Sequence, residues 1–226
     1  MLITCADAIR QQVALPVEAS RALLRSACRL ANPHPPIVSM MLGMHARTLE
    51  VLQHLDVAAK GFLDALQAIP ERQRDRRLAD NIWSAANVAS HLARTEGQVA
   101  AFLQRALRQA LANRSLPVVS ATGSVLASVD DVVVLDRTNA LEAPEFAMPN
   151  FTMTAVVALP ELERARARTR QVLLAGDGLD TTSIRRTHHV LGELNFEQWI
   201  VFVGLHQQRH TAQLHELANK LSSARD

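Results

Sequence analysis

Apolar residues recur every three or four positions in four stretches of the chain, the spacing that places them on one face of an α-helix. We predict helices over residues 45–69, 84–113, 160–176 and 196–221. Pro70 ends the first helix, and Ser84 is suited to cap the second. Pro160 is suited to the first position of the third helix, with some turn from Thr154, and Gly176 stops it. Four amphipathic helices must bury their faces together, which predicts an all-α domain.

The segment between the second and third helices lacks this period. Residues 114–159 are rich in Pro, Gly, Ser and Asp, and they form a longer connection than helices usually have. Such a crossover can link two helices that run parallel and can form the wall of a site. Its VVVL run at 132–135 could be an isolated strand; we interpret it as a loop or a short helix packed on the bundle.

Two further segments are assigned to loops. The charged run at 71–77 is interpreted as a solvated loop. The segment at 176–195, GDGLDTTSIRRTHHVLGELN, is predicted to be a loop leading into the last helix. Its two histidines, His188 and His189, are interpreted as loop residues.

The N-terminal 43 residues differ from the rest. They carry four arginines against two acidic residues, have no clean amphipathic stripe past Pro16, and end in a cluster of prolines. An arginine-rich leader can be a transit peptide, but the two acidic residues and the lack of a cleavage pattern argue against this. Met40, Met41 and Met44 suggest a second possibility, that the true start lies downstream and the segment is a poorly ordered extension. We therefore expect an N-terminal extension over 1–43 outside the domain, a bundle over 44–221 and a short tail at 222–226.

Composition narrows the function classes. Hydrophobic residues make up 48% of the 226, aromatic residues only 4%, and the formal net charge is +2. A nearly balanced charge argues against nucleic-acid binding, which needs a concentrated basic face. Cys5 and Cys28 form no metal-binding pattern, and no apolar run approaches the roughly 20 residues of a membrane helix. We expect a cytoplasmic protein that binds neither nucleic acid nor membrane.

Three histidines lie within the apolar stripes. His206 and His210 are four residues apart in the last helix, so their ring nitrogens can converge on one point, as two ligands of a divalent metal do. His91 in the second helix supplies a third ligand if the two helices pack side by side. A lone histidine in such a stripe is more often a hydrogen-bonded core residue, and this alternative remains open.

Sequence motifs add a resemblance to a known family. WSAANVASHL begins at Trp83, APEF follows at 143–146, and LGELNFEQWIVFVGLHQQRHTAQL begins at Leu191. The segment from Met44 to Leu221 thereby resembles the DinB-like superfamily of metal-binding four-helix bundles, whose last helix typically carries H-x-x-R-H or H-x-x-x-H followed by a glutamine. The resemblance implies a four-helix bundle with a long crossover between helices two and three (the DinB/YfiT-like fold).

The resemblance also implies a metal site and an activity. His91, His206 and His210 are its implied ligands, and zinc or nickel the implied metal. Members of the family include S-transferases and isomerases that use a low-molecular-weight thiol, while others resemble hydrolases. We expect a metal-dependent enzyme that activates a small thiol or water for a small-molecule substrate, and a homodimer. The alternatives are a non-catalytic metal-binding module of a stress-response or regulatory kind and an inert helical scaffold.

Other residues receive provisional roles. Glu96 and Gln213 are candidates for orienting the ligands or transferring a proton, although each also has a plain packing interpretation. Arg209 cannot share the face of the ligands and is expected to anchor the crossover. A ferritin-like di-iron site is excluded because no glutamate has a histidine three positions later, and the H-E-x-x-H motif of metalloproteases is absent.

Overall fold

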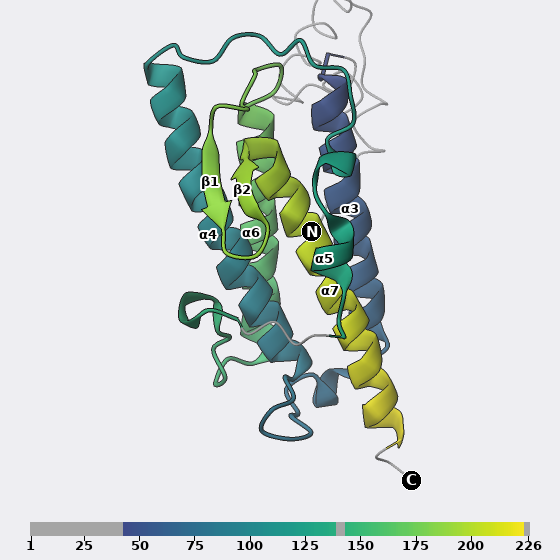
Figure 1. Ribbon diagram of the computed structural model, residues 1–226. Coiled ribbons are helices and arrows are strands. Elements are labelled where there is room, and N and C mark those ends of the chain that lie inside the picture. The colour runs from purple at the N-terminus through teal and green to yellow at the C-terminus, as the bar shows by residue number, and fades with distance from the viewer. Residues whose placement is uncertain (1–42, 139–142, 224–226) are drawn as a thin grey trace, which may run out of the picture. The chain divides into compact units, whose positions relative to one another are not determined.

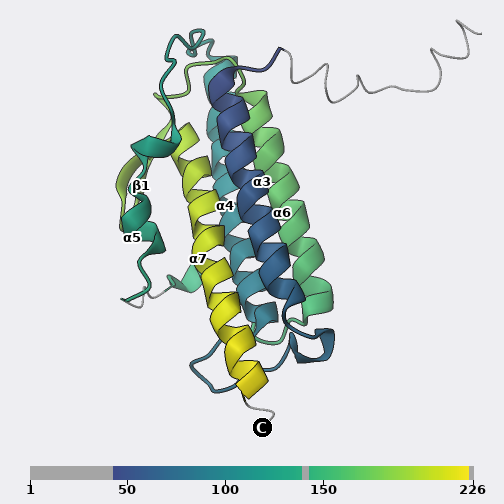
Figure 2. The same ribbon diagram turned by 90° about the vertical axis from the view of Figure 1, so that its right-hand side faces the viewer.

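Four long helices form a bundle in the computed structural model, which describes residues 43–138 and 143–223 (Figures 1 and 2). They are α3 (Ala46–Gln67), α4 (Ala85–Ala112), α6 (Ala155–Ala175) and α7 (Phe196–Ser223). The closest packing is of α4 along α6 and of α3 along α7. The predicted four-helix bundle is confirmed, whereas the prediction for residues 1–42 lies outside the described residues. None of the described helices is long and apolar enough to cross a membrane.

Helices α4 and α6 run in the same direction. Both end at the same end of the bundle (Figure 1), where Val118, in the segment after α4, forms an antiparallel bridge with Leu179, in the segment after α6. The Asp180 N–H donates to the Pro117 carbonyl over 2.8 Å at the same place. The long crossover between parallel helices is therefore confirmed.

The crossover contains a short helix, α5 (Asp131–Leu135), which covers the VVVL run. Asp130 caps it by accepting a hydrogen bond from the Val133 N–H over 3.2 Å. Helix α5 lies against α7 (Figure 2). The interpretation of this run as a loop or short helix packed on the bundle is correct.

The start of α4 is fixed by a reciprocal cap. Ser84 Oγ accepts from the Asn87 N–H over 3.1 Å, and Asn87 Oδ1 accepts from the Ser84 N–H over 3.2 Å. Both groups are buried. This capping box sets the rotation of α4 and thereby the face on which His91, two turns later, lies.

The predicted start of the third helix is wrong. Helix α6 begins at Ala155, with Thr154 as its N-cap, so Pro160 lies inside the helix. Proline removes one intrahelical hydrogen bond. The helix nevertheless continues through Pro160, because buried side chains before it (Ala155, Ala158) and after it (Leu162) pack against the core. The free Ala155 N–H donates to the Asp75 carboxylate over 2.6 Å. That contact comes from the distant 71–77 segment and leaves no mark in the local sequence pattern.

The loop predicted for 176–195 contains a β-hairpin instead. Strands β1 (Arg185–His188) and β2 (Gly192–Asn195) pair antiparallel, with Arg185 opposite Asn195 and His188 opposite Gly192. Gly192 has a φ of +73°, which side-chain-bearing residues rarely adopt. The two strands of the hairpin are short, charged and mostly exposed, so they lack the alternation of apolar and polar residues that reveals a strand in sequence.

The apolar core is divided by a polar layer. One cluster includes Leu103 and Ile200, and the other includes Leu92 and Leu214. Between them, α4, α6 and α7 bury polar side chains, namely His91, Glu96, Arg166, Gln207 and His210. Buried polar groups are costly unless they are paired or have a function, so this layer is where a site is to be sought.

Close packing of α3 on α7 depends on Gly204. A Cβ atom at this position would lie 2.2 Å from His54 Nε2, which is 3.0 Å from the Val201 carbonyl oxygen. We expect Gly204→Ala to displace the imidazole and to lower the free energy of unfolding by about 1 kcal/mol, since the hydrogen bond is lost. In a His54→Ala background the same change should stabilise the protein by roughly 0.5–1 kcal/mol through helix propensity. Urea unfolding of the four proteins measures this reversal of sign, and equal effects in both backgrounds would contradict it.

Candidate metal centre

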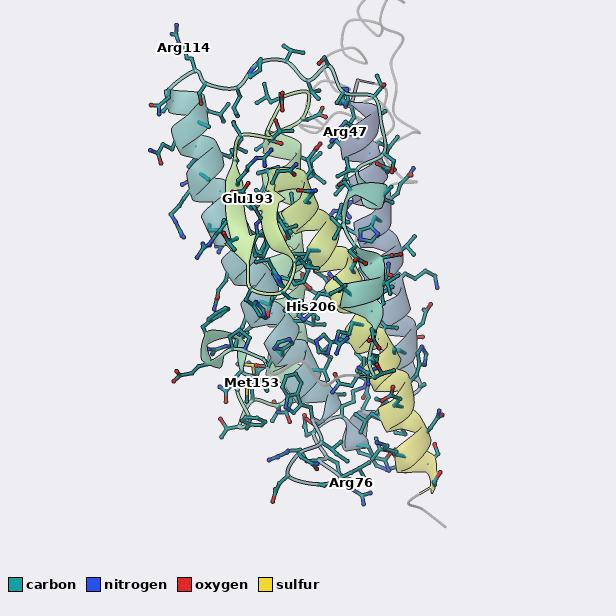
Figure 3. All side chains as sticks on the ribbon, viewed as in Figure 1. Arg47, Arg76, Arg114, Met153, Glu193 and His206 are labelled. Carbon is teal, nitrogen blue, oxygen red and sulfur yellow. The ribbon has the colours of Figure 1, made fainter. Side chains whose placement is uncertain are left out.

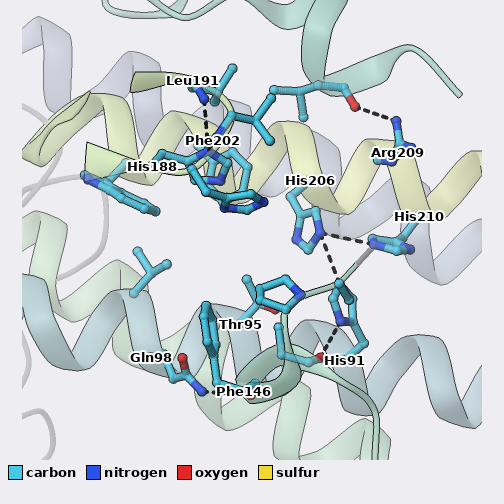
Figure 4. A pocket seen from close by; sticks show the side chains of 18 of the residues that line it. His91, Thr95, Gln98, Phe146, His188, Leu191, Phe202, His206, Arg209 and His210 are labelled. Carbon is cyan, nitrogen blue, oxygen red and sulfur yellow. Dashed lines mark hydrogen bonds between the residues drawn. The ribbon is translucent and has the colours of Figure 1, made fainter. Parts of the chain in front are cut away.

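The structure brings His91 of α4 together with His206 and His210 of α7 (Figure 4). His206 Nε2 lies 3.2 Å from His91 Nε2 and 3.1 Å from His210 Nε2. One nitrogen from each ring lies within 4.8 Å of the other two. Nitrogens bound to one zinc ion at about 2.1 Å and near-tetrahedral angles are roughly 3.4 Å apart. The spacing therefore suits three ligands of a single metal ion, about half-way along the bundle (Figure 3).

Hydrogen bonds on the far side of two rings orient their lone pairs. His91 Nδ1 lies 2.6 Å from the Ala147 carbonyl oxygen, which can only accept, so Nδ1 carries the proton. His210 Nδ1 likewise donates to Gln213 Oε1 over 2.7 Å. Both Nε2 atoms consequently present lone pairs to a common point. A proton on His206 Nε2 can be donated to one of them at a time, whereas a cation accepts all three lone pairs at once.

Burial keeps the three imidazoles neutral. Burial, together with the neighbouring imidazoles, lowers the pKa of His210 to about 3 and that of His206 well below its ordinary value. The pKa of His91 is lowered mainly by burial as well. Neutral imidazole is the form that binds a metal. The residues present therefore fit a divalent cation with a preference for nitrogen ligands.

Aromatic rings hold the histidines in place. The Trp83 ring stacks on His210 with 6.1 Å between centroids and contacts His91 at 4.9 Å. Phe202 stacks on His206 at 5.4 Å. These rings restrict the motion of the imidazoles and keep water from two sides of the centre.

A cavity of about 830 Å³ opens beside the histidines. Its walls come from α4, α7, β1 and the crossover, and all three imidazoles line it. Phe102, Trp199 and Phe202 make part of the wall apolar. A metal held by the three rings would thus face a space large enough for a small molecule.

The crossover is fastened over this cavity by side chains of the helices. Arg209 donates hydrogen bonds to the carbonyls of Val134 (3.0 Å) and Asp136. Arg94 and Gln98 both donate to the Phe146 carbonyl. The expectation that Arg209 anchors the crossover is confirmed.

The two candidate auxiliary residues have different positions. Gln213 lines the cavity and bonds His210. Glu96 does not line it, because five residues on a helix turn the side chain about 140° away from His91. Glu96 is fully buried beside a second cavity of about 220 Å³, together with Arg166 and Gln207. The interpretation of Glu96 as a proton-transfer group at the histidines is therefore corrected.

Burial also changes the pKa of the Glu96 carboxyl group. Neither carboxylate oxygen has a hydrogen-bond partner of suitable geometry within the described part of the chain. Burial raises the pKa of this carboxyl from its ordinary 4.5 to about 8, although Arg166 and Gln207 oppose the change. Glu96 is thus a predominantly neutral core residue near pH 7.

Sequence reasoning missed the place of His188. Interpreted above as a loop residue, it is buried at the end of β1 and lines the main cavity. Its ring packs on Phe202 and Trp199, with centroids 4.5 and 5.3 Å away. The nearby Gly192, which permits the hairpin turn, was the only local signal that could have placed it.

One comparison with known proteins gives a match. A family model described as the DinB superfamily matches residues 54–214, a range that includes all three histidines, Gln213 and His188. Searches of curated proteins and of solved structures give no significant match.

Proposed function

The chain belongs to the DinB superfamily, and from the arrangement of its histidines we propose that it is a metal-dependent enzyme that activates a small thiol for transfer. The observation that supports this most strongly is the convergence of three Nε2 atoms beside a large cavity. Structural zinc sites have four protein ligands, whereas sites that react with a substrate keep one position open. Three imidazoles leave such a position on the cavity side.

Each residue of the site has a distinct task in this proposal. His91, His206 and His210 would hold a zinc or nickel ion. When bound, the metal would act as a Lewis acid that lowers the pKa of a thiol, or of a water molecule, at the open position. The Ala147 carbonyl and Gln213 orient two of the rings, while Trp83 and Phe202 exclude water.

Thr95 is placed to orient the incoming group. It lies one turn beyond His91 on the same face of α4 and lines the cavity. Its buried hydroxyl has no hydrogen-bond partner within residues 43–138 and 143–223. It can therefore accept a hydrogen bond from a thiol before the proton leaves, or donate one to the thiolate afterwards.

A thiol-transfer assay tests the proposal. The tag-free protein is combined with cysteine, glutathione or another low-molecular-weight thiol and with chlorodinitrobenzene as electrophile. We expect turnover that disappears on chelation and returns with zinc or nickel. Metal-dependent hydrolysis of an ester without any thiol would instead support activation of water. Stoichiometric metal without turnover in either assay would support a non-catalytic metal-binding module.

The hydrogen bond from His210 to Gln213 provides a sharper test of the site. We expect Gln213→Leu to weaken zinc binding about 10- to 100-fold, because the partner that fixes the ring and its tautomer is lost. Gln208→Leu makes the same chemical change on the same helix, at a side chain that does not line the cavity. Competition with a fluorescent zinc chelator measures both affinities, and equal affinities for the two variants would contradict the role of Gln213.

A further inference from the structure

The main cavity has a one-sided charge. Four arginines line it, Arg105, Arg137, Arg186 and Arg209, and no carboxylate does among the described residues. Two of them have structural partners: Arg137 binds Glu216 over 2.6 Å, and Arg209 holds the crossover carbonyls. Arg105 and Arg186 form no ion pair in the described part of the chain.

One of these arginines packs on the Phe102 ring of α4, and the other lies one helical turn from Phe102. The Arg186 guanidinium lies over the Phe102 ring, 4.7 Å from its centroid. Arg105 is three residues beyond Phe102 on α4 and so lies on the same face of that helix, one turn away. Both side chains are exposed at the cavity wall. Two arginines without acidic partners in the wall of one cavity suit an anion.

His188 adds a directed donor to this end of the cavity. It is two residues from Arg186 on β1, so both lie on one face of the strand. Its Nδ1 accepts hydrogen bonds from the Val190 and Leu191 N–H groups, each over 3.2 Å (Figure 4). Because Nδ1 is the acceptor, Nε2 carries the proton, and no residue of the described chain accepts it. The side chain is only 8% exposed, and it lines the cavity.

An apolar wall connects this group to the metal centre. His188 packs on Phe202, which stacks on His206. A molecule that contacts both His188 and the three histidines must therefore cross the Phe202 side chain. Its middle part would be apolar, and its two ends would be chemically different.

We propose that Arg105, Arg186 and His188 form an anion subsite, which binds the carboxylate or phosphate at one end of an elongated substrate. The other end of this substrate reaches the three histidines. That second statement rests on the proposed function, whereas anion binding itself does not require the metal.

Calorimetric titration of the full chain tests the subsite. Hexanoate, hexyl phosphate and hexanol share one apolar tail and differ in the head group. We expect the better of the two anions to bind at least tenfold more tightly than hexanol, and the preferred anion distinguishes carboxylate from phosphate. Arg105→Gln and Arg186→Gln should each weaken anion binding about tenfold and leave hexanol unaffected, since each removes a charge-assisted contact.

Arg185→Gln is the matched control. Arg185 precedes Arg186 on β1, pairs with Glu193 and does not line the cavity, so its replacement should leave anion affinity unchanged. His188→Phe keeps a ring against Phe202 but removes the N–H, and it should weaken the anions selectively. The titrations are repeated after chelation, where the affinity should persist.

Three outcomes would overturn the subsite. The first is equal affinity for anion and alcohol, and the second is equal anion affinity of the Arg105, Arg186 and Arg185 variants. The third is loss of anion binding on chelation, which would place the head group on the metal. A protein that binds no metal but shows arginine-dependent anion binding would disprove the proposed function and leave the subsite standing. A protein with metal-dependent thiol transfer and no preference for anions would support the proposed function and disprove the subsite.

Discussion

Replacing His206 with alanine is expected to reduce bound zinc from about one per chain to almost none. His206 Nε2 is the nitrogen nearest to both others, at 3.1 and 3.2 Å, so its loss leaves two ligands on one side of the centre. Two imidazoles hold zinc far more weakly than three, because a metal site needs at least a third protein ligand. Elemental analysis of tag-free protein after dialysis measures the change.

The same variant should lose its stabilisation by metal. A ligand that binds only the folded state at about 1,000 times its dissociation constant adds roughly 4 kcal/mol to the free energy of unfolding. Wild-type protein should therefore melt at a higher temperature with zinc than without it, and His206→Ala should not respond.

His215→Ala is the control for both experiments. His215 is an exposed residue on the same helix, outside the histidine cluster, so its replacement should leave metal content and the response to zinc unchanged. Full metal content in His206→Ala, or equal loss in both variants, would contradict the assignment of His206.

A second large effect is expected at Glu96, in the pH dependence of stability. Its pKa is about 8 in the folded protein against an ordinary 4.5, so the folded state holds an extra proton between these values. The neutral carboxyl is compatible with burial, so the contribution of this group to the free energy of unfolding is fully present below pH 4.5. It is lost as the pH rises from 4.5 to about 8. The shift corresponds to a loss on the order of 5 kcal/mol.

Glu96→Gln removes this titration while keeping a neutral side chain of similar shape. We expect the variant to match the wild type near pH 4.5 and to exceed its free energy of unfolding by several kcal/mol at pH 9. Histidines of low pKa impose the opposite slope below pH 6.5, but they are common to both proteins and cancel in the comparison. Urea unfolding of metal-free protein at both pH values measures the difference.

Glu163→Gln is the control for this comparison. Glu163 also contacts the Arg166 guanidinium, but from the surface, where its side chain is 59% exposed. Glu163 has only the weakest of the effects that set the pKa of Glu96, so its replacement should leave most of the pH dependence of the wild type in place. A Glu96→Gln protein with the same slope as the wild type would show that Glu96 ionises freely in the core.

The helices and two of the site's histidines were predictable because their signals are local. Apolar residues that recur every three or four positions identified α7, and the same spacing placed His206 and His210 on its buried face. Ser84 identified the start of α4 because a capping box involves residues only three positions apart. His91 could be named as a third ligand only if α4 packs beside α7. In the structure the two helices do pack against each other.

What the sequence concealed depends on contacts between distant segments. Asp75 reaches the start of α6, and the turn after β1 gives His188 its two N–H donors. Glu96 and Gln213 were equal candidates in the sequence, and only the packing of α4, α6 and α7 separates the buried carboxylate from the residue that orients His210. Side-chain chemistry could be read from the sequence, but the cavity to which each side chain belongs could not.

Anomalous X-ray diffraction from zinc-loaded crystals, recorded at the zinc absorption edge, locates the metal relative to the three histidines. We expect one strong anomalous peak per chain about 2.1 Å from the Nε2 atoms of His91, His206 and His210. A peak bound to Nδ1 atoms, a peak at which His188 or His215 replaces one of the three, or no peak at these histidines would contradict it.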